Sequence, residues 1–354
     1  MSLTADSMRC GEFRTTYKAD TTIFPTPRSR NFAIAGLIVL LFAPHVLDTY
    51  YTNLLIQIGY YGIAALGLNI LVGFSGQISL GHSAFFGFGA FASAWISNNF
   101  GVPVILAIPL AGLMTTAVGM IVGIPAARIK GLYLAIATLA AQFILEDFFN
   151  RADWFSGGSA GSVAQPLNLF GFVFATDKSY FYVVLFFMVV MYLAGSNLLR
   201  SRDGRAFVAV RDHYLSAEIM GINLTKYRIL AFGVSSFYAG IGGALFGHYL
   251  GFVSAEGFTI LLSIQFLAMI IIGGLGSVMG TLLGTVFIVL LPEVMEALMT
   301  TLGSQLPGLE RGVSYLKEMA IGLAIVLFLI FEPDGLAHRW KQIKAYWKLY
   351  PFSY

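Results

Sequence analysis

The chain has 354 residues, of which 57% are hydrophobic and only 11% are charged. An ordinary soluble domain carries about 25% charged residues, so this composition excludes a water-soluble globular protein and predicts a chain solvated mainly by lipid. The net charge of +3 gives no reason to expect a nucleic-acid partner, and the single cysteine, Cys10, excludes an intramolecular disulfide and a cysteine-based metal site.

Crossing a bilayer takes about 20 mostly apolar residues. Taken in chain order, the segments that meet this requirement are roughly 32–50, 53–73, 80–98, 102–123, 131–148, 179–198, 229–250, 258–275, 279–298 and 314–332. The third is the weakest because it is rich in glycine, so it is a candidate for a broken or re-entrant helix. We therefore predict an all-α polytopic membrane protein with about 10 transmembrane helices, and about 8 if weak segments re-enter.

The distribution of positive charge predicts the orientation. Ten spans place the N-terminal tail, the link at 124–130, the loop at 199–228 and the C-terminal tail on one side of the membrane, and these segments hold 17 of the 21 Lys and Arg residues. Because positive residues concentrate on the cytoplasmic side, both termini are expected there. An even span count is needed for this result. Ten spans divide into two halves of opposite topology, which suggests a 5+5 inverted repeat.

The same reasoning divides the chain into three parts. Residues 1–31 form a polar cytoplasmic tail, residues 32–332 form the transmembrane domain, and residues 333–354 form a basic cytoplasmic tail. Polar residues precede the first apolar run and no cleavage pattern follows it, so no signal peptide is expected.

Small residues at four-residue spacing predict close helix contacts, because small side chains let helix backbones approach each other in lipid. Ser79, Ser83 and Gly87 would share one face of a helix. The residues expected to serve helix packing are Ser83, Gly87, Gly240, Gly276 and Gly280.

Polar residues inside apolar spans need a hydrogen-bond partner or a water-filled cavity. Those that could line a translocation path are Asn69, Gln77, Ser79, His82 and Gln142, although a packing role for each is the competing interpretation. Helix breaks near Gly76 and Gly273 could present backbone groups to a substrate carboxylate.

No acidic residue lies near the centre of a predicted span, which argues against an ion-coupled carrier. The sequence also lacks a G-x-x-x-x-G-K-[ST] phosphate loop. The chain is therefore expected to bind no cofactor, and ATP and Mg²⁺, if they drive transport, belong to another subunit.

The loop at 199–228 is the longest polar connection between spans. Asp203-Gly204 indicates a turn, residues 205–220 fit a short helix, Gly221 suits its C-terminal cap, and Asn223 tolerates turn conformations. Such a helix could dock in a groove on a partner, or the loop could be an ordinary solvated basic segment.

Several blocks of the chain resemble the LivM-type permease subunits of branched-chain amino-acid ABC importers. They occur in family order and include 65–94 (ALGLNILVGFSGQISLGHSAFFGFGAFASA), 124–138, Arg202 to Phe232, 272–293, and Phe331 to Leu336. The resemblance covers roughly 50–337 and leaves out both tails.

The resemblance implies the membrane subunit of an ABC importer of the bacterial inner membrane, with no catalytic residue of its own. Its partners would be a second related permease, two cytoplasmic ATPase subunits, a periplasmic binding protein and membrane lipid. The ATPase-coupling loop would contain Arg205, Arg211, Asp212, Ala217, Glu218, Gly221 and Asn223. The wider ABC-permease pattern of Glu-Ala-Ala followed by Gly is only partly kept, as Leu215-Ser216-Ala217 and then Gly221.

Two alternatives stay open at this point. Urea, short amides, other amino acids or aromatic acids could be the substrate within the same architecture, and a self-sufficient channel or ion-coupled carrier would belong to a different class.

Overall fold

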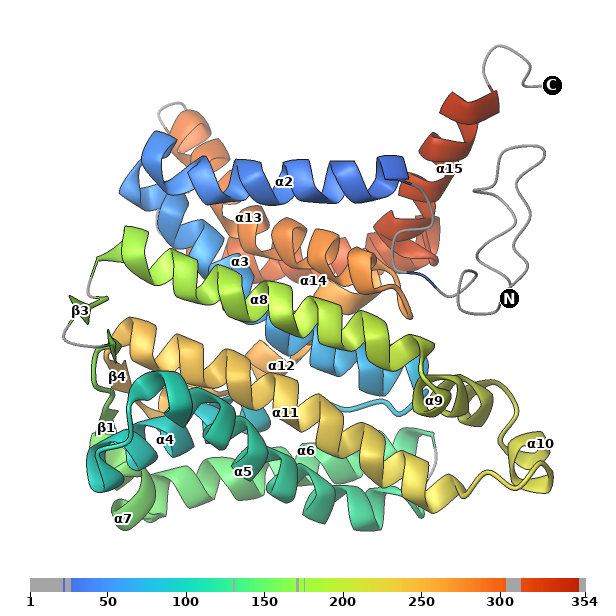
Figure 1. The fold of residues 1–354 in the computed structure, drawn as a ribbon, viewed down its shortest axis with the longest axis horizontal. Coiled ribbons are helices and arrows are strands. Elements are labelled where there is room, and N and C mark those ends of the chain that lie inside the picture. Colours follow the sequence, from blue (N-terminus) through green and yellow to red (C-terminus); the bar gives the residue numbers. More distant parts are fainter. Residues whose placement is uncertain are drawn as a thin grey trace.

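The computed structural model describes residues 22, 27–129, 131–169, 172–174, 176–303 and 313–349. Most of the predicted N-terminal tail, including Cys10, lies outside these residues. Figure 1 shows the long helices α2, α5, α6, α8 and α11 side by side along one direction, with α10 at one end of the bundle and the short strands at the other. We call these the α10 end and the strand end.

The first half of the chain is almost entirely helical. Its elements are α2 (Pro27–Val46), α3 (Thr49–Asn69), the π-helix η2 (Ile70–Phe74), α4 (His82–Phe100), α5 (Val104–Ala126), α6 (Leu132–Arg151), α7 (Asp153–Ser156) and the 3-10 helix η3 (Gly158–Ala160).

The second half repeats long helices around a few short strands. Its elements are β1 (Ser162–Val163), β2 (Asn168–Leu169), β3 (Phe172–Val173), α8 (Asp177–Arg200), α9 (Arg202–Asp212), α10 (Tyr214–Ile219), α11 (Leu224–Leu250), β4 (Phe252–Val253), η4 (Ala255–Gly257), α12 (Ile260–Gly273), α13 (Val278–Gly303), α14 (Val313–Phe331) and α15 (Gly335–Leu349). β1 pairs antiparallel with β4, and β2 with β3.

The structure confirms an all-α polytopic membrane protein. Every predicted span coincides with a helix, and 8 helices of the described residues are long and apolar enough to cross a membrane, or up to 9 if α14 and α15 form one bent span. α4, the segment predicted to be weakest, is absent from those 8.

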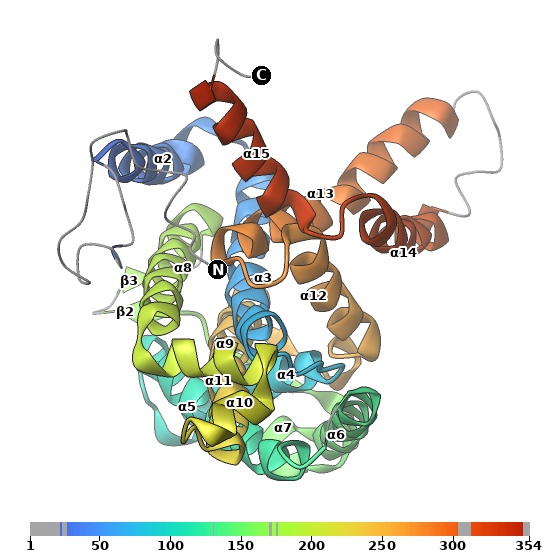
Figure 2. The same ribbon diagram turned by 90° about the vertical axis from the view of Figure 1, so that its right-hand side faces the viewer.

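Two helices form the centre of the bundle. α11 packs against α3, α4 and α5, and α3 also packs against α8, α12 and α13 (Figure 2). The helices of each half thus pack on a long helix of the other half. This exchange agrees with an inverted repeat, which itself stays a prediction.

Glycine permits the closest of these contacts. A Cβ atom at Gly243 of α11 would overlap the carbonyl oxygen of Phe86 in α4, and one at Gly240 would lie 3.0 Å from the Cα atom of Gly112 in α5. At Gly87 a Cβ atom would lie 2.6 Å from the ring of Phe258. Any larger residue would force these helices apart.

The structure places one member of the predicted small-residue row, and one of the predicted packing residues, outside a regular helix. Ser79 precedes α4, which begins at His82, so Ser79 does not share a helix face with Ser83 and Gly87. Gly276 likewise precedes α13; it lies in the break after α12 and has a φ of 75°, a left-handed conformation. Gly280 does lie in α13, where an added Cβ would crowd Ala337 at 2.8 Å.

The single helix expected at 205–220 is also wrong. Two helices, α9 and α10, occupy this region, and His213 separates them with φ −147° and ψ 80°. The turn expected at Asp203-Gly204 is instead the first turn of α9, because the hydroxyl of Ser201 accepts a hydrogen bond from the Gly204 N–H and caps the helix.

Candidate functional site

Two helices begin partway along the bundle rather than at one of its ends. Residues 75–81 lead from η2 to α4, and residues 254–259 lead to α12 without an α-helix. α12 has 14 residues, or about 21 Å, which is shorter than the roughly 30 Å hydrocarbon core of a bilayer. Because α3 ends at the α10 end and α11 at the strand end, the chain enters α4 and α12 from opposite ends.

The first turns of these two helices meet at three buried side chains, Ser83 of α4, Gln142 of α6 and Ser263 of α12, which we call the polar tie. Ser83 Oγ donates to the Thr259 carbonyl oxygen at 2.7 Å and lies 3.0 Å from Gln142 Oε1. Ser263 Oγ accepts from the Ser83 N–H at 2.9 Å. The side chains of all three tie residues are fully buried.

The polar tie satisfies backbone groups that the helix starts leave open. Gln142 Oε1 accepts from the Ala84 N–H at 2.9 Å, and Gln142 Nε2 donates to the Phe258 carbonyl oxygen at 2.7 Å. Nearby, the Leu80 N–H donates to Thr138 Oγ1 at 3.0 Å. Unpaired backbone groups are costly at membrane depth, so these side chains let two helices start there.

Two more residues predicted for a translocation path lie on the segment before α4. Gln77 is buried, and its Nε2 donates to Ser75 Oγ at 2.5 Å while its Oε1 has no hydrogen-bond partner. Ser79 is fully buried, and its hydroxyl accepts from the Gly81 N–H at 3.4 Å.

His82 opens α4 and is also fully buried. Its Nε2 lies 2.8 Å from the Ala64 carbonyl oxygen of α3, its Nδ1 has no partner, and its ring packs edge-on against Phe266. Gln77 and His82 therefore each carry one buried polar atom that the protein leaves unpaired.

Asn69, the last of the five residues predicted for a translocation path, lies nearer the α10 end. Its Nδ2 donates to the Ser277 carbonyl oxygen at 3.0 Å and to Thr281 Oγ1 at 2.6 Å, and its Oδ1 accepts from the Gly276 N–H at 2.9 Å. Asn69 thus connects the last turn of α3 to the break between α12 and α13.

Arg211 joins the loop to the same place. Its Nη1 donates to the Gly73 carbonyl oxygen at 2.5 Å, and its Nε pairs with Asp212 at 2.8 Å. Gly73 lies in the π-helix η2, a type of helix that occurs often at functional sites. Asn69, Gly73, Arg211 and Gly276 together form what we call the joint.

α9 is packed firmly against the bundle. Phe207 is fully buried and meets the ring of Tyr227 edge-on, and Tyr227 Oη donates to Asp203 Oδ1 at 3.2 Å. Arg205 donates to the Arg200 carbonyl oxygen at 2.9 Å. These contacts fix α9 to α8 and α11, so a displacement of α9 would be passed to both spans.

α10 projects beyond every other element at its end of the bundle (Figure 1). Ala217 is its only buried residue, whereas Leu215 is 61% exposed, Ile219 87% and Met220 85%. Glu218, which lies between them in sequence, is also exposed. This tip is an apolar surface of the kind that marks an interaction site.

Two residues shape the chain after α10. Gly221 has a φ of 86° and its N–H donates to the Glu218 carbonyl oxygen at 2.9 Å, as expected for a residue that ends a helix. Asn223 caps α11 by accepting a hydrogen bond from the Lys226 N–H at 3.0 Å.

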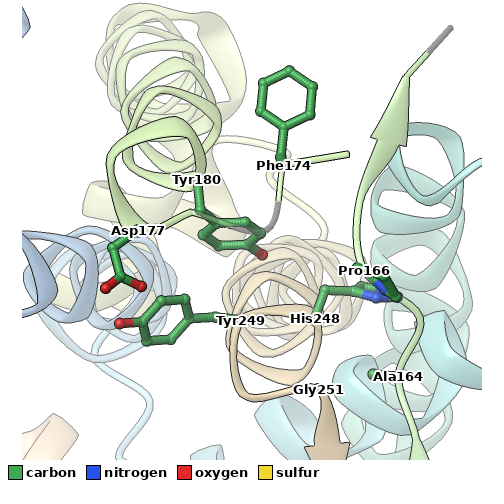
Figure 3. Close-up of a pocket in the computed structure, with 8 residues that line it drawn as sticks. All are labelled: Ala164, Pro166, Phe174, Asp177, Tyr180, His248, Tyr249 and Gly251. Atoms are coloured by element: carbon green, nitrogen blue, oxygen red, sulfur yellow. The ribbon is translucent and has the colours of Figure 1, made fainter. Parts of the chain in front are cut away.

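At the strand end, a cavity of about 180 Å³ lies between the ends of α8 and α11 (Figure 3). Its polar groups already have partners. His248 contacts Ser93 Oγ and the Gln165 carbonyl oxygen, each at 2.7 Å, and Tyr180 Oη donates to the Leu245 carbonyl oxygen at 2.7 Å. These bonds hold the strand end together.

The residues missed by the sequence analysis are Ser263, Thr138, Gly73, Ile219 and Met220. Ser263 and Thr138 are polar residues inside apolar spans, the same signal that identified Gln142. Ile219 follows Leu215 at four-residue spacing, which places both on one side of a helix, and Met220 comes directly after α10.

Comparison with known proteins places these features in context. Residues 50–330 match the family model described as the permease component of branched-chain amino acid transport systems. The chain is 30% identical over 336 residues to the high-affinity branched-chain amino acid transport permease LivM of Salmonella typhimurium, covering 88% of this chain and 75% of that protein.

Less similar relatives include permeases named for the same substrates and for a sugar. A probable branched-chain amino acid permease LivH of Methanocaldococcus jannaschii is 27% identical, covering 83% of this chain and 92% of the relative. The ribose import permease RbsC of Haemophilus influenzae is 25% identical, covering 70% and 77%. No solved structure matches the chain.

Proposed function

The chain belongs to the family of branched-chain amino-acid transport permease components, and from this membership we propose how its parts work in an ABC importer. It is a multi-pass inner-membrane protein and the membrane component of a transporter. The substrate class that we propose is the branched-chain amino acids, as named for its LivM relatives. ATP hydrolysis would take place on partner subunits.

The exposed apolar tip of α10 is the observation that carries the ATPase part of the proposal. Leu215, Ile219 and Met220 face solvent on the segment that projects furthest from the bundle. A short helix with such a face suits a groove on a partner protein. We propose that α10 docks on a cytoplasmic ATPase, with both termini on that side as the charge distribution predicts.

The joint would carry motion from α10 into the membrane. α9 is fixed to the bundle, and Arg211 contacts the π-helix at the end of α3. Asn69 contacts the break before α13. We propose that closure of the ATPases moves α9 and shifts these two helix ends, so that the protein alternates between outward- and inward-open states.

The polar tie would act as a fixed point during this movement. It joins the starts of α4 and α12, which enter from opposite ends as half-helices do in transporters with inverted repeats. We propose that the path runs beside this tie, near the unpaired polar atoms of Gln77 and His82. A second permease and a periplasmic binding protein complete the proposed importer.

Co-purification from native membranes tests ATPase docking. The tagged wild type and an Ile219→Ser, Met220→Ser variant are compared with Ser216→Ala, an exposed change on the same helix. Burying two apolar side chains contributes about 3 kcal/mol, so the double variant should bind the ATPase about 100-fold more weakly.

Retention of the ATPase by wild type and Ser216→Ala, together with its loss from the double variant, supports the proposal. Equal recovery from all three proteins would place docking elsewhere. If no ATPase is recovered and the purified chain alone transports solute into liposomes, the protein is a channel or carrier.

A further inference from the structure

The last helix of the structure leaves the bundle at a fixed bend. α15 begins after residues 332–334 and is bent by 50° from the end of α14. Gly335 lies in the left-handed region with a φ of 71°, and a Cβ atom there would lie 2.5 Å from the Gly274 nitrogen. Ala337 contacts Gly280 in α13. The beginning of α15 is therefore held against the breaks at the α10 end.

One face of α15 is apolar over its described side chains. Leu336, Trp340 and Ile343 recur at spacings of four and three residues, which places them in one stripe. Leu336 is half-buried against the bundle, but further along the stripe Trp340 is 47% exposed and Ile343 49%. The stripe thus continues beyond the point where the protein covers it.

A basic flank runs beside this stripe. Lys341, Lys344 and Lys348 follow at three- and four-residue spacing, and α15 contains no acidic residue. Lys344 Nζ lies 5.5 Å from the centre of the Trp340 ring. On the opposite flank, Arg339 pairs with Glu332 at 2.5 Å. Lysines and tryptophan side by side are typical of the boundary between lipid headgroups and acyl chains.

The position and direction of α15 indicate what covers its apolar face. In Figure 1 it turns away from the direction shared by α2, α8 and α11, and in Figure 2 it extends past the bundle beside α2. In Figure 1 it leans partly toward the α10 end, but most of its length runs across the direction of the bundle. With α14 crossing the membrane, a helix about 22 Å long that begins directly after it and runs mostly sideways remains close to the level of the headgroups.

We propose that α15 is an interfacial helix that binds anionic lipid of the leaflet at the α10 end. Trp340 and Ile343 enter the boundary between headgroups and acyl chains, and Lys341 and Lys344 of the basic flank contact lipid phosphates. The inference needs α14 to cross the membrane but does not depend on ATPase docking by α10.

Spin-label depth measurements on the full-length chain test this proposal. In a Cys10→Ser background, one label is placed at Ile343 and a matched label at Ala345, which lies on the opposite face of α15 and is also exposed. The protein is studied in nanodiscs of phosphatidylcholine with and without phosphatidylglycerol. Collisions with oxygen report the acyl region, and collisions with a water-soluble nickel chelate report the aqueous phase.

The expected result is that the label at 343 favours oxygen and the label at 345 favours the nickel chelate. Phosphatidylglycerol should increase the difference, and the triple change Lys341→Gln, Lys344→Gln, Lys348→Gln should remove that increase. Equal nickel accessibility at both positions would overturn lipid burial. A triple variant that still responds to phosphatidylglycerol would overturn the role of the lysines. Protection at 343 that appears only after ATPase subunits are added would show a protein-docking face instead.

Discussion

Arg211 in the loop and Gly73 in the π-helix, 138 residues apart in sequence, are joined by a 2.5 Å hydrogen bond from Nη1 to the carbonyl oxygen. Gly73 lies in the last turn of η2, whose carbonyl groups have no partner within the helix, and the guanidinium satisfies one of them. It therefore ties the position of α9 to the conformation at the end of α3. A side chain that does both is well placed to convert movement of the loop into movement of a span.

The first prediction concerns this bond. Arg211→Lys keeps the positive charge but loses the planar guanidinium that reaches Gly73 and Asp212 together. The variant should bind the ATPase as well as wild type, since Ile219 and Met220 are unchanged, but should transport at least about 10-fold more slowly, which corresponds to about 1.4 kcal/mol. Uptake into proteoliposomes containing the full complex measures this.

Asp212→Asn serves as the matched control, because it weakens only the exposed pair with Arg211 and leaves the bond to Gly73. Exposed ion pairs contribute about 0–1 kcal/mol, so its transport rate should stay near wild type. Equal rates for Arg211→Lys and wild type would remove the joint from the mechanism.

A second prediction tests the polar tie. Gln142→Leu keeps a similar volume but leaves the Ala84 N–H buried without a partner, at about 1–3 kcal/mol, and leaves the Phe258 carbonyl oxygen with only the 3.3 Å contact to Ser83 Oγ. Its thermal midpoint in detergent should fall clearly. Phe143→Leu, a change at the exposed neighbouring position, should stay close to wild type. A Gln142→Leu protein as stable as Phe143→Leu would show that the tie does not stabilise the helix starts.

Close packing of α4 and α11 gives a third prediction. A methyl group at Gly243 would overlap the Phe86 carbonyl oxygen, whereas one at Gly322 in α14 meets no atom within 4 Å. Gly243→Ala should therefore lower the thermal midpoint or prevent folding. Gly322→Ala should be neutral or stabilising by up to about 1 kcal/mol. A larger fall in thermal midpoint for Gly322→Ala than for Gly243→Ala would contradict the observed helix contact.

The left-handed conformation of Gly221 gives a fourth. Gly221→Val would strain the backbone by about 1–2 kcal/mol, although no atom lies within 4 Å of the added Cβ. It should reorient α10 and reduce ATPase recovery. Gly221→Asn should recover more ATPase, because Asn tolerates this region. Equal losses for Asn and Val would mean that side-chain size, and not backbone conformation, disturbs docking.

A fifth prediction tests the orientation in the membrane. In a Cys10→Ser background, a cysteine at Trp154 should react with an impermeant maleimide added to intact spheroplasts. A cysteine at Met220 should react only after the membrane is opened. Both positions are highly exposed, at 68% and 85%. The opposite pattern would invert the protein and place the α10 end outside.

The positions of the helices could be predicted from the sequence because a long apolar segment in lipid has to form a helix to pair its backbone groups. The breaks between and within these helices were harder to predict. Ser79 fits the four-residue spacing of Ser83 and Gly87, yet the helix starts only at His82. Spacing reports which residues would share a face if a helix formed, and does not show where the helix begins.

The candidate site was readable only in part. Asn69 and Gln142 were visible as polar residues in apolar spans, but their partners Thr281 of α13 and Phe258, the residue after η4, lie more than 100 residues away. Gly73 has no sequence signal at all, because its role rests on a carbonyl group that every residue possesses. Arg211 was named as a coupling-loop residue because of the family resemblance, and the structure adds its contact with Gly73.

The polar tie also has a consequence for biosynthesis. Ser83 and Gln142 are made early, whereas Ser263 belongs to a helix that leaves the ribosome more than 100 residues later. Until then, the start of α4 lacks one of its acceptors in a medium without water. The first half of the chain must therefore be sheltered by the insertion machinery, or by a membrane chaperone, while the second half is translated. A chain truncated after α8 should be a substrate for membrane proteases rather than a stable domain.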